Sequence, residues 1–528
     1  MSCESLGFTC PIRPGKVLVV GAGSSGLIAA RHFKDDGWTV TIVEERGDLG
    51  GTWEAAYSSA RVQNSGEQYR FADFPMPKEI RADRFPNRDQ LRSYFKAYVR
   101  HHGLDILFNT RPSAMTYVRE KAGWSVSLVG VGGGNDSATK EFYEFVILAT
   151  GYCSKPYTPP LPGKETFRGI IHHSANLSRF TRSDFSALFM GKKVAVVGMG
   201  KSAMDLVECA HESGATEIQQ IARRARWMLP FKIGPVHISH VVMTRAVSSM
   251  VPSWTHTTRI EKSLHKGTAS VPAAFWKVIE KLFAWIHGFE KSSPLYPKEP
   301  VTNALTYSIG VVTPAYHRLV RSNSITFHIP ASIPALEGSS IHLSDATTIP
   351  DVDVLILATG SRSTGFDFLP ETISSALVED DGVHLYRGMI HPDVPALAFA
   401  GINSSYMHFV TTELGIQWLL AHLRGTVPLP PPSAIRASLD ADRDWKRLHT
   451  PKESHRSAVS ACYQQYVDLL CADLGVPVYR KLKKWGWWNP IGWAAEVLGQ
   501  LDPTDFRGVK DEVEARHGKG KQPPAVAT

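Results

Sequence analysis

The feature that most constrains this chain is a glycine-rich turn between two short apolar runs near its start. Residues 17–20 are apolar, the turn reads Gly21-Ala22-Gly23-Ser24-Ser25-Gly26, and the second run, residues 39–43, ends at Glu44. This order predicts the strand, turn, helix and strand of a dinucleotide-binding unit. Gly21 would allow the tight turn, Gly23 would let a pyrophosphate reach the backbone, and Gly26 would let helix and strand pack closely.

Two further features indicate how this first site would hold its ligand. The predicted helix presents free N–H groups and the positive end of its dipole to phosphates, and Glu44 lies about 20 residues beyond the turn, where a carboxylate can bind a ribose hydroxyl. Gly50, Gly51, Thr52 and Trp53 follow. A glycine pair lets the backbone approach a flat ring system, and a neighbouring aromatic ring can cover one face of it, so this site is predicted to take FAD.

A second glycine motif follows the apolar run at residues 193–197. It reads Gly198-Met199-Gly200-Lys201-Ser202-Ala203, with Ala203 in the place of the third glycine. The next predicted strand, residues 217–222, ends at Arg223-Arg224 and not at an acid. Arginines can bind a 2′-phosphate bidentately and stack on adenine. The second site is therefore predicted to take NADPH; the alternative is an arginine cluster that is only solvated surface.

The same phrase occurs twice, once on each side of the second motif. Residues 144–148 lead into Ala149-Thr150-Gly151, and residues 353–357 lead into Ala358-Thr359-Gly360. Two copies of a buried strand followed by Ala-Thr-Gly predict two places where the chain passes between a dinucleotide domain and its neighbour. The alternative is two similar buried strands.

Two regions of the sequence each allow two interpretations. Within residues 230–300, residues 275–289 have the pattern of an amphipathic helix, which would be core or, less favoured, the wall of a substrate channel. Near the C-terminus, Lys483-Lys484-Trp485-Gly486-Trp487-Trp488 could touch a membrane surface. Such tryptophans more often pack against the parent domain, and the sequence alone favours packing.

Composition excludes several classes of function. The formal charge is +8 over 528 residues, but no basic run is long or aromatic-interleaved enough to predict a nucleic-acid partner. Six scattered cysteines without a CxxC pair suit a reducing, cytoplasmic compartment and argue against a two-dinucleotide disulfide reductase. The start lacks the pattern of a secretory signal, no apolar run reaches about 18 residues, and no spacing predicts a metal site.

These observations predict an α/β fold with two nested Rossmann-like dinucleotide-binding domains and a mostly helical C-terminal region. The expected boundaries are residues 1–15 for an N-terminal arm, 16–185 with 325–435 for the FAD domain, 186–324 for the NADPH domain with a helical insertion, and 436–528 for the C-terminal region.

In its order of motifs the chain resembles the class B flavin-dependent monooxygenases, which comprise flavin-containing and Baeyer–Villiger monooxygenases. The resemblance runs from about residue 16 to about residue 425 and includes Asn64. The family's FxGxxxH fingerprint is matched by Phe167, Gly169 and His173, whereas the aromatic expected four residues later is replaced by Leu177. That departure removes the usual indication of which branch the chain belongs to.

The resemblance implies a mechanism. NADPH would reduce FAD, reduced flavin would add O₂ to form a C4a-hydroperoxide, and NADP⁺ would stay bound while a small organic substrate is oxygenated. Asn64 would be the catalytic residue, a neutral donor beside the flavin; the alternative is a turn residue in Asn64-Ser65-Gly66. His173 would fix the linker between domains and would not act as a base.

The predicted site residues fall into two groups. Those for FAD are Gly21, Gly23, Ser24, Ser25, Gly26, Glu44, Gly51, Thr52, Trp53, Asn64, Thr150, Gly151 and Gln417. Those for NADPH are Gly198, Gly200, Lys201, Ser202, Ala203, Arg223 and Arg224.

Three functions remain open at this stage. Oxygenation at nitrogen or sulfur, or hydroxylation, is favoured because the tryptophan of the Baeyer–Villiger group is missing. Baeyer–Villiger oxygenation of a ketone is the alternative, and a non-catalytic flavin-binding redox protein is a remote one.

Overall fold

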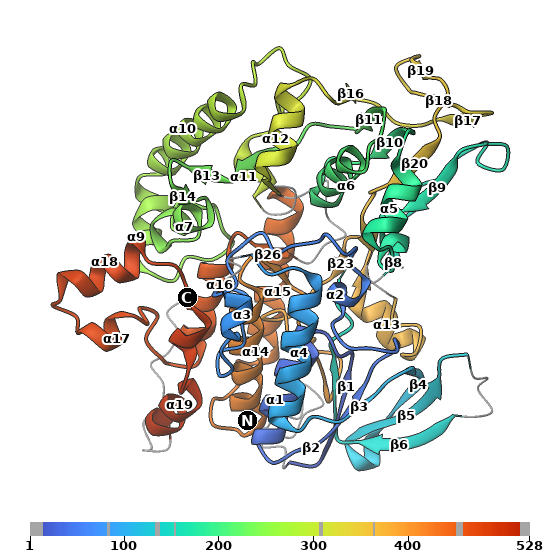
Figure 1. The fold of residues 1–528 in the computed structure, drawn as a ribbon. Helices are drawn as coiled ribbons and strands as arrows, with labels where there is room; N and C mark the ends of the chain where they lie inside the picture. The colour runs from blue at the N-terminus through green and yellow to red at the C-terminus, as the bar shows by residue number, and fades with distance from the viewer. Residues whose placement is uncertain are drawn as a thin grey trace.

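Two parallel β-sheets organise this protein (Figure 1). The computed structural model describes residues 14–81, 85–132, 138–152, 155–305, 310–362, 365–449 and 458–517. The predicted N-terminal arm, residues 1–15, lies outside the described residues except for its last two positions. In the view of Figure 1 the first sheet lies in the lower half, the second at the upper right, and a helical region at the left.

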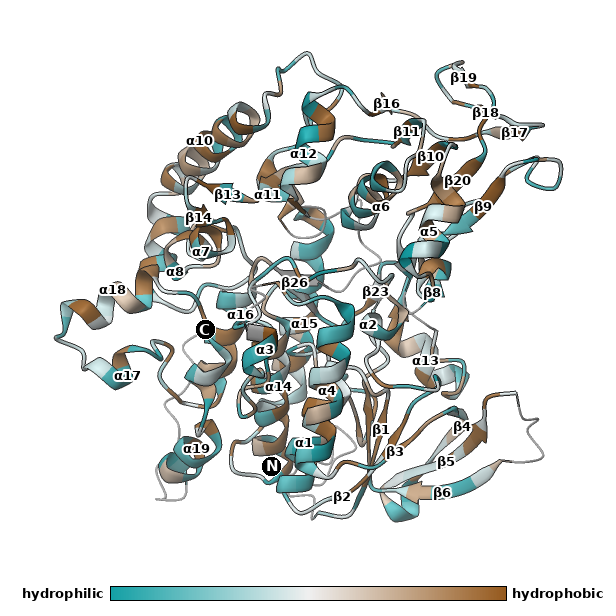
Figure 2. Ribbon diagram, viewed as in Figure 1, coloured by the Kyte–Doolittle hydropathy of each residue, from teal (hydrophilic) through white to brown (hydrophobic). Residues whose placement is uncertain are grey.

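The first sheet contains the N-terminal glycine turn. Its strand order is β24-β7-β1-β2-β3 and all its described pairings are parallel. Helix α1 (Ser24–Asp35) packs between this sheet and α14 (His408–Leu423). Because α1 packs on this sheet and β5 (Gly123–Gly130) and β6 (Thr139–Tyr143) also contact its strands, the inner strands are buried and form continuous apolar runs. They colour brown in Figure 2. The strands are β1 (Lys16–Val20), β2 (Thr39–Val43), β3 (Ile106–Leu107), β7 (Phe145–Leu148) and β24 (Leu397–Phe399).

The second sheet is built in the same way around the second glycine turn. Its order is β16-β11-β10-β20-β9, again with parallel pairings. Helices α5 (Arg182–Phe189), α6 (Lys201–Glu212) and α12 (Pro314–Arg321) accompany it. The strands are β9 (Ile170–His173), β10 (Lys193–Val197), β11 (Glu217–Ile221), β16 (Thr326–His328) and β20 (Val354–Leu357).

The second sheet includes strands from outside residues 186–324, the range predicted for the second domain. β9, β16 and β20 were all expected in the first unit, yet they belong to the second sheet. The physical reason is non-local pairing: β20 supplies the parallel neighbour that β10 needs on its open side, and β9 in turn pairs with β20. Local sequence does not reveal which sheet an isolated apolar run will join.

The two Ala-Thr-Gly turns mark the crossings between the sheets, as predicted. β7 of the first sheet runs through Thr150 and Gly151 toward β8 (Lys155–Pro156), and β20 of the second sheet runs through Gly360 into β21 (Ser361–Arg362). β8 and β21 pair with each other in antiparallel fashion. The outgoing and returning chain therefore lie side by side between the two sheets.

Helices from the insertion and from the C-terminal region cover the remaining side. The expected amphipathic helix at 275–289 is α10 (Ser270–His287). The other helices of the insertion and the C-terminal region are α7 (Ser239–Val242), α8 (Arg245–Ser248), α9 (Arg259–Lys262), α11 (Val301–Ala304), α15 (Pro432–His449), α16 (Tyr463–Asp473), α17 (Leu482–Trp485), α18 (Pro490–Leu498) and α19 (Val509–His517).

None of the helices among the described residues is both long and apolar enough to cross a membrane.

Smaller elements complete the fold. An antiparallel sheet of β4, β5 and β6 flanks the first parallel sheet (Figure 1). In the described part of the chain, Cys209, Cys462 and Cys471 are free thiols. The smaller elements are α2 (Thr52–Ala55), α3 (Lys78–Arg81), α4 (Arg88–His102), β4 (Thr110–Val118), β5 (Gly123–Gly130), β6 (Thr139–Tyr143), β12 (Met228–Pro230), β13 (Lys232–Ile233), β14 (Val236–His237), β15 (Gly310–Val312), β17 (Ala335–Glu337), β18 (Ser340–His342), β19 (Thr348–Ile349), α13 (Glu371–Leu377), β22 (Val378–Glu379), β23 (Gly382–Val383), β25 (Ser404–Ser405) and β26 (Ala458–Ser460).

Candidate functional site

One cavity of about 1590 Å³ opens at the carboxyl ends of both parallel sheets. Ligands of open parallel sheets bind at this edge. Both glycine turns, both Ala-Thr-Gly turns and the arginines after β11 line this one space. The predicted site residues that line it are Gly21, Gly23, Ser24, Ser25, Glu44, Gly51, Thr52, Trp53, Asn64, Thr150, Gly151, Gly198, Gly200, Lys201, Ser202, Arg223 and Arg224.

Three predicted residues do not line the cavity. Gly26 and Ala203 lie behind the turns, where they let helix and strand pack: a Cβ on Gly26 would collide with the carbonyl oxygen of Gly21, and Ala203 is fully buried. Gln417 is a different case. It lies on α14, of which only the first residue, His408, lines the cavity, so the structure does not bring Gln417 to the site.

The first glycine turn is fixed by close backbone approach. Gly21 has φ +110°, and a Cβ there would lie 2.6 Å from the carbonyl oxygen of Ala149. Gly23 and Gly51 face each other across the mouth of the turn, because a Cβ on Gly51 would lie 3.1 Å from the Cα of Gly23. The two glycines thus keep the entrance to α1 clear of side chains.

The N-terminus of α1 is open for an anion. Its N-cap, Gly23, offers no side-chain hydrogen bond, and the first turn holds no acidic residue. The N–H groups of the first turn of a helix have no partner within the helix, so they and the dipole favour a phosphate here. α6 repeats this arrangement, with Gly200 as a bare N-cap and no acid in its first turn.

Glu44 ends β2 at the wall of the cavity and is 8% exposed. Its carboxylate accepts hydrogen bonds from the backbone N–H groups of Ala22 at 2.8 Å and Arg46 at 2.9 Å. These bonds hold the side chain beside the glycine turn, which is the position that ribose recognition requires.

Trp53 lies on the short helix α2 (Thr52–Ala55), and Asn64 lies on the irregular segment that follows it. Trp53 donates its indole N–H to the hydroxyl of Tyr69 at 2.6 Å. Asn64 is 8% exposed, and its amide donates to the carbonyl oxygen of Tyr406 at 3.1 Å. Asn64 is therefore oriented by a segment distant in sequence.

The second site differs from the first in charge. Arg223 and Arg224 follow β11, and Arg226 adds a third guanidinium to the cavity wall. Arg224 lies 3.8 Å from the carboxylate of Glu299. Lys201 forms an ion pair with Asp205, which also accepts a hydrogen bond from the hydroxyl of Tyr57. The cationic rim suits a phosphate beyond the pyrophosphate.

A third part of the cavity is apolar. We call it the apolar chamber and define it by seven side chains that both line the cavity and belong to one cluster: Leu229, Ile238, Val251, Trp276, Phe283, Leu305 and Ala461. None of the seven is charged. The chamber draws on the insertion and the C-terminal region, and one face of α10 contributes Trp276 and Phe283. For that face, the channel-wall interpretation of α10 holds as well as the core interpretation.

Sequence reasoning missed several residues of the cavity. His408 contacts the Ser25 hydroxyl through its Nε2 at 2.7 Å and thereby joins the N-terminal ends of α1 and α14. Ser248 of α8 donates to the hydroxyl of Tyr463 of α16 at 3.0 Å, and both residues line the cavity. The sequence signal near His408 was Gly401, which ends a run of small residues. A Cβ on Gly401 would collide with Ser25 and approach His408.

His173 lies at the end of β9 and also lines the cavity. Its Nδ1 accepts the backbone N–H of Ala175 at 3.1 Å. Burial lowers the pKa of His173 below its ordinary value. A neutral imidazole that caps its own turn fits the positional role that the fingerprint suggested.

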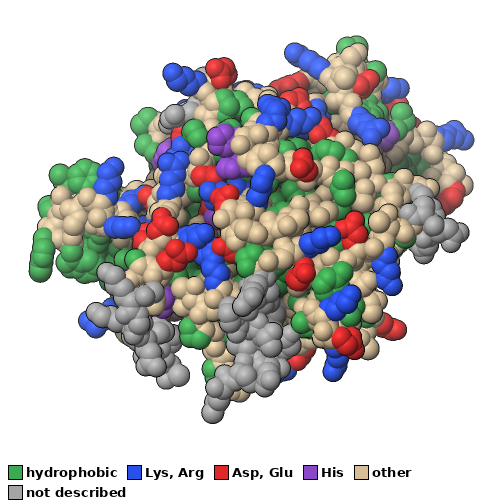
Figure 3. Space-filling view, turned by 90° about the horizontal axis from the view of Figure 1, so that it is seen from below, with side chains coloured by type: hydrophobic (Ala, Val, Ile, Leu, Met, Phe, Trp, Pro, Cys, Tyr) green, Lys and Arg blue, Asp and Glu red, His purple; other side chains and the backbone are tan. Residues whose placement is uncertain are grey.

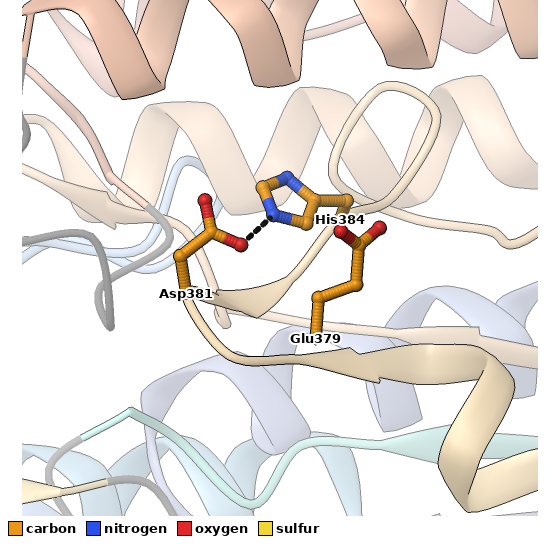
Figure 4. A group of neighbouring side chains, drawn as sticks. All are labelled: Glu379, Asp381 and His384. Atoms are coloured by element: carbon orange, nitrogen blue, oxygen red, sulfur yellow. Dashed lines mark hydrogen bonds and ion pairs between the residues drawn. The ribbon is translucent and has the colours of Figure 1, made fainter.

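One group with metal-ligand chemistry lies outside this cavity. Glu379, Asp381 and His384 converge near the β22–β23 hairpin (Figure 4). Arg447 of α15 pairs with both carboxylates, at 2.7 and 2.9 Å. Although burial opposes it, hydrogen bonds from Arg447 and His384 lower the pKa of Asp381. The carboxylates already have cationic partners, so we assign the group to holding α15 against the hairpin.

Acid is expected to destabilise the fold through two buried histidines. Burial lowers the pKa of His408 and of His422 to about 4, from 6.5. The unfolded chain therefore binds more protons between pH 6.5 and 4, so stability is complete above 6.5 and falls as the pH drops toward 4. Each group contributes about 3 kcal/mol across that window. Urea unfolding midpoints at pH 7 and pH 5 check this, and the midpoint should fall between them. The fall should be smaller in His422→Gln, which has one buried histidine fewer. A wild-type midpoint that is the same at both pH values would contradict the expectation.

Comparisons with known proteins agree with this arrangement. The model of the flavin-binding monooxygenase-like family matches residues 14–275 and 317–481. A probable flavin-containing monooxygenase 1 of Arabidopsis thaliana is 26% identical over 93% of this chain and 98% of its own.

Solved structures share the fold. S-allyl-L-cysteine S-oxygenase from Allium sativum superposes with a TM-score of 0.60, at 19% identity over 96% of this chain and 98% of that one. Cyclohexanone monooxygenase from Rhodococcus sp. Phi1 bound to NADP⁺ gives 0.64, at 15% identity over 88% and 98%. At these identities the likeness establishes a mixed α/β fold with parallel sheets.

Proposed function

This chain belongs to the flavin-binding monooxygenase-like family, and from that membership and the geometry of its cavity we propose that it is an NADPH- and O₂-dependent flavoprotein monooxygenase. The observation that carries the proposal is that both glycine turns, each leading into an uncapped helix, line one cavity. The two sheets would then be nested Rossmann-like domains, with FAD on the first and NADPH on the second.

The residues present fit both cofactors. The facing glycines Gly23 and Gly51 and the held carboxylate of Glu44 support FAD on the first sheet, with Trp53 and Asn64 further along the same wall. Space at Gly200, where an added Cβ would meet no atom within 4 Å, supports a second dinucleotide whose extra phosphate meets Arg223 and Arg224. Bound flavin supplies the redox and oxygen-activating chemistry, and the nicotinamide supplies the hydride.

The chain's own residues would bind, orient and exclude water. The buried amide of Asn64, held by the Tyr406 carbonyl, is a preorganised neutral donor, and such donors stabilise developing negative charge without reorganisation. Seven uncharged side chains of the apolar chamber would keep water from the reacting centre.

The chamber favours a neutral apolar substrate, with oxygenation at a soft heteroatom such as sulfur. A protonated amine would lose hydration in the chamber without gaining a charged partner. Baeyer–Villiger oxygenation of a ketone is the second candidate, which the likeness to cyclohexanone monooxygenase keeps open. Incubating the protein with NADPH, air and either a thioether or a cyclic ketone separates the two, by sulfoxide or by lactone. Purified protein that binds flavin but does not oxidise NADPH would favour a non-catalytic redox role.

Arg223→Ala is expected to weaken the binding of NADPH and to leave the binding of NADH unchanged. Loss of a charge-assisted bidentate contact costs about 1.5–3 kcal/mol, which corresponds to a rise of about 10- to 100-fold in the KM for NADPH. The KM for NADH should stay within about twofold, because NADH lacks the 2′-phosphate. Arg119→Ala is the matched control, since Arg119 is exposed and does not line the cavity. An equal rise for both nucleotides would contradict the assignment.

Gly200→Ala is expected to separate binding from folding. Gly200 has φ −87°, and its added Cβ would enter empty space, so the fold should lose less than about 1 kcal/mol. The methyl group would instead occupy room assigned to the pyrophosphate, and the KM for NADPH should rise about tenfold or more. Gly198→Ala is the contrast, because φ is +133° there and the new Cβ would collide with the Ala358 carbonyl. That variant should lose stability itself. Unchanged NADPH kinetics in Gly200→Ala would count against the site.

A further inference from the structure

The segment from Lys481 to Gly499 carries several large apolar side chains that are exposed. We call it the tryptophan lobe; it comprises α17 and α18 with the turn between them. Trp485, Trp487 and Trp488 are 44%, 55% and 93% exposed. The sequence-based expectation of packing against the parent domain is therefore wrong for Trp488. Trp487 is partly covered, because its ring contacts those of Tyr479 and Trp493.

The outer face of α18 is apolar as well. Ile491 and Leu498 are 62% and 66% exposed and lie seven residues apart, on one face of the helix together with Ala494. The opposite face is fixed to the body. Glu496 accepts from Arg245 at 2.9 Å and from the backbone N–H of Lys481 at 2.8 Å. The lobe is thus anchored on its inner side and unpartnered on its outer side.

The shape and charge of the lobe restrict what could cover it. α17 and α18 project from the body at the left of Figure 1, and the lobe is seen as a protruding hydrophobic mass in Figure 3. Lys484 is exposed beside the tryptophans, and Lys483 is exposed as well but pairs with Glu512 at 2.7 Å. α10, at the same side of Figure 1, presents exposed Val278 and Trp285 and colours brown in Figure 2; Lys277 and Lys281 flank them, and both are exposed.

We propose that the tryptophan lobe docks this enzyme on an anionic lipid surface. Indole rings have an apolar body and a polar N–H and settle at the headgroup level of a bilayer. Lysines beside them gain attraction from anionic headgroups. A convex tip with its tryptophans outermost can enter a soft interface, whereas a rigid protein partner would need a matching hollow. The lobe is an interfacial contact and not an anchor that spans.

Vesicle flotation of the flavin-loaded protein tests the proposal. The protein should float with phosphatidylcholine vesicles that contain about 30% phosphatidylglycerol, should float poorly with phosphatidylcholine alone, and should be released as salt rises from about 0.05 M to about 0.5 M. The double variant W487S/W488S should lose at least about tenfold in partitioning. Its NADPH oxidation without lipid should match wild type, since neither residue lines the cavity.

Met190→Ser is the matched control, because Met190 is an equally exposed hydrophobic side chain outside the lobe. It should float like wild type. Wild-type protein that does not float with anionic vesicles, or W487S/W488S that floats as well as wild type, overturns the proposal. If wild type is a dimer by light scattering and W487S/W488S a monomer that floats no less, the lobe is an interface between copies of this chain and the lipid assignment is wrong.

Discussion

Asn64→Ala is expected to keep bound FAD and NADPH oxidation near the wild-type level, while the yield of oxygenated product falls about 100-fold and H₂O₂ replaces it. The magnitude follows from the loss of one preorganised donor to a developing negative charge, about 2.7–4 kcal/mol. Asn64 lines the cavity, is buried, and has its amide oriented by the Tyr406 carbonyl at 3.1 Å. The measurement is product and H₂O₂ per NADPH consumed, with a thioether as substrate.

Two further variants separate chemistry from loop position. Asn64→Asp places a carboxylate against the Tyr406 carbonyl oxygen and beside developing negative charge, so it should uncouple at least as strongly as alanine. Tyr406→Phe removes the hydroxyl that donates to the Leu305 carbonyl at 3.1 Å but keeps the backbone acceptor for Asn64. It should retain most of the product. Wild-type yields in both Asn64 variants would remove this residue from the reaction, and equal loss in Tyr406→Phe would assign the effect to the loop.

Arg245→Met is expected to destabilise the protein by about 3–5 kcal/mol, which is the cost of leaving buried carboxylates without their cation. Arg245 is 6% exposed and Asp468 is fully buried. The guanidinium donates to Asp468 at 2.6 and 3.1 Å, to Glu496 at 2.9 Å and to the Val478 carbonyl at 2.9 Å. It ties α8 of the insertion to α16 and α18. The midpoint and slope of urea unfolding measure the change.

The same contact positions part of the cavity wall. Ser248 lies one turn after Arg245 and donates to Tyr463, and both of these residues line the cavity. Arg245→Met should therefore also raise the KM for an apolar substrate. The triple variant R245M/D468L/E496M should regain most of the stability, because apolar side chains of similar volume can replace a buried ion network. A change below about 1 kcal/mol in Arg245→Met, or no recovery in the triple variant, would contradict this account.

The glycine turns were predictable because their constraint is local. Gly21 and Gly198 adopt φ values of +110° and +133° that side chains rarely tolerate, and a pattern of apolar runs on both sides leaves few other folds. Glu44, Arg223 and Arg224 follow from the same logic, since each stands within three residues of the end of a strand that the pattern identifies. The amphipathic pattern also placed α10 to within about five residues at either end.

The rest depends on contacts that no short window contains. β9 and β20 joined the second sheet through pairing with distant strands, and His408 reached the cavity only because α14 begins beside Ser25. Gln417 does not line the cavity, because α14 meets it only through His408 at its first position. The sequence of a helix that is buried along most of its length does not reveal which end lies at the cavity. The apolar chamber combines Trp276 with Ala461, which nothing in either sequence neighbourhood joins.

The central claim is that two nucleotides on separate sheets meet across one cavity, and anaerobic titration of the flavin-loaded protein tests it most directly. Adding NADPH without oxygen should bleach the visible flavin absorbance at once, NADH should do so far more slowly, and air with a thioether should restore the absorbance together with one sulfoxide per NADPH. If NADPH binds and the flavin absorbance stays unchanged, the two sites do not communicate and the monooxygenase assignment is wrong.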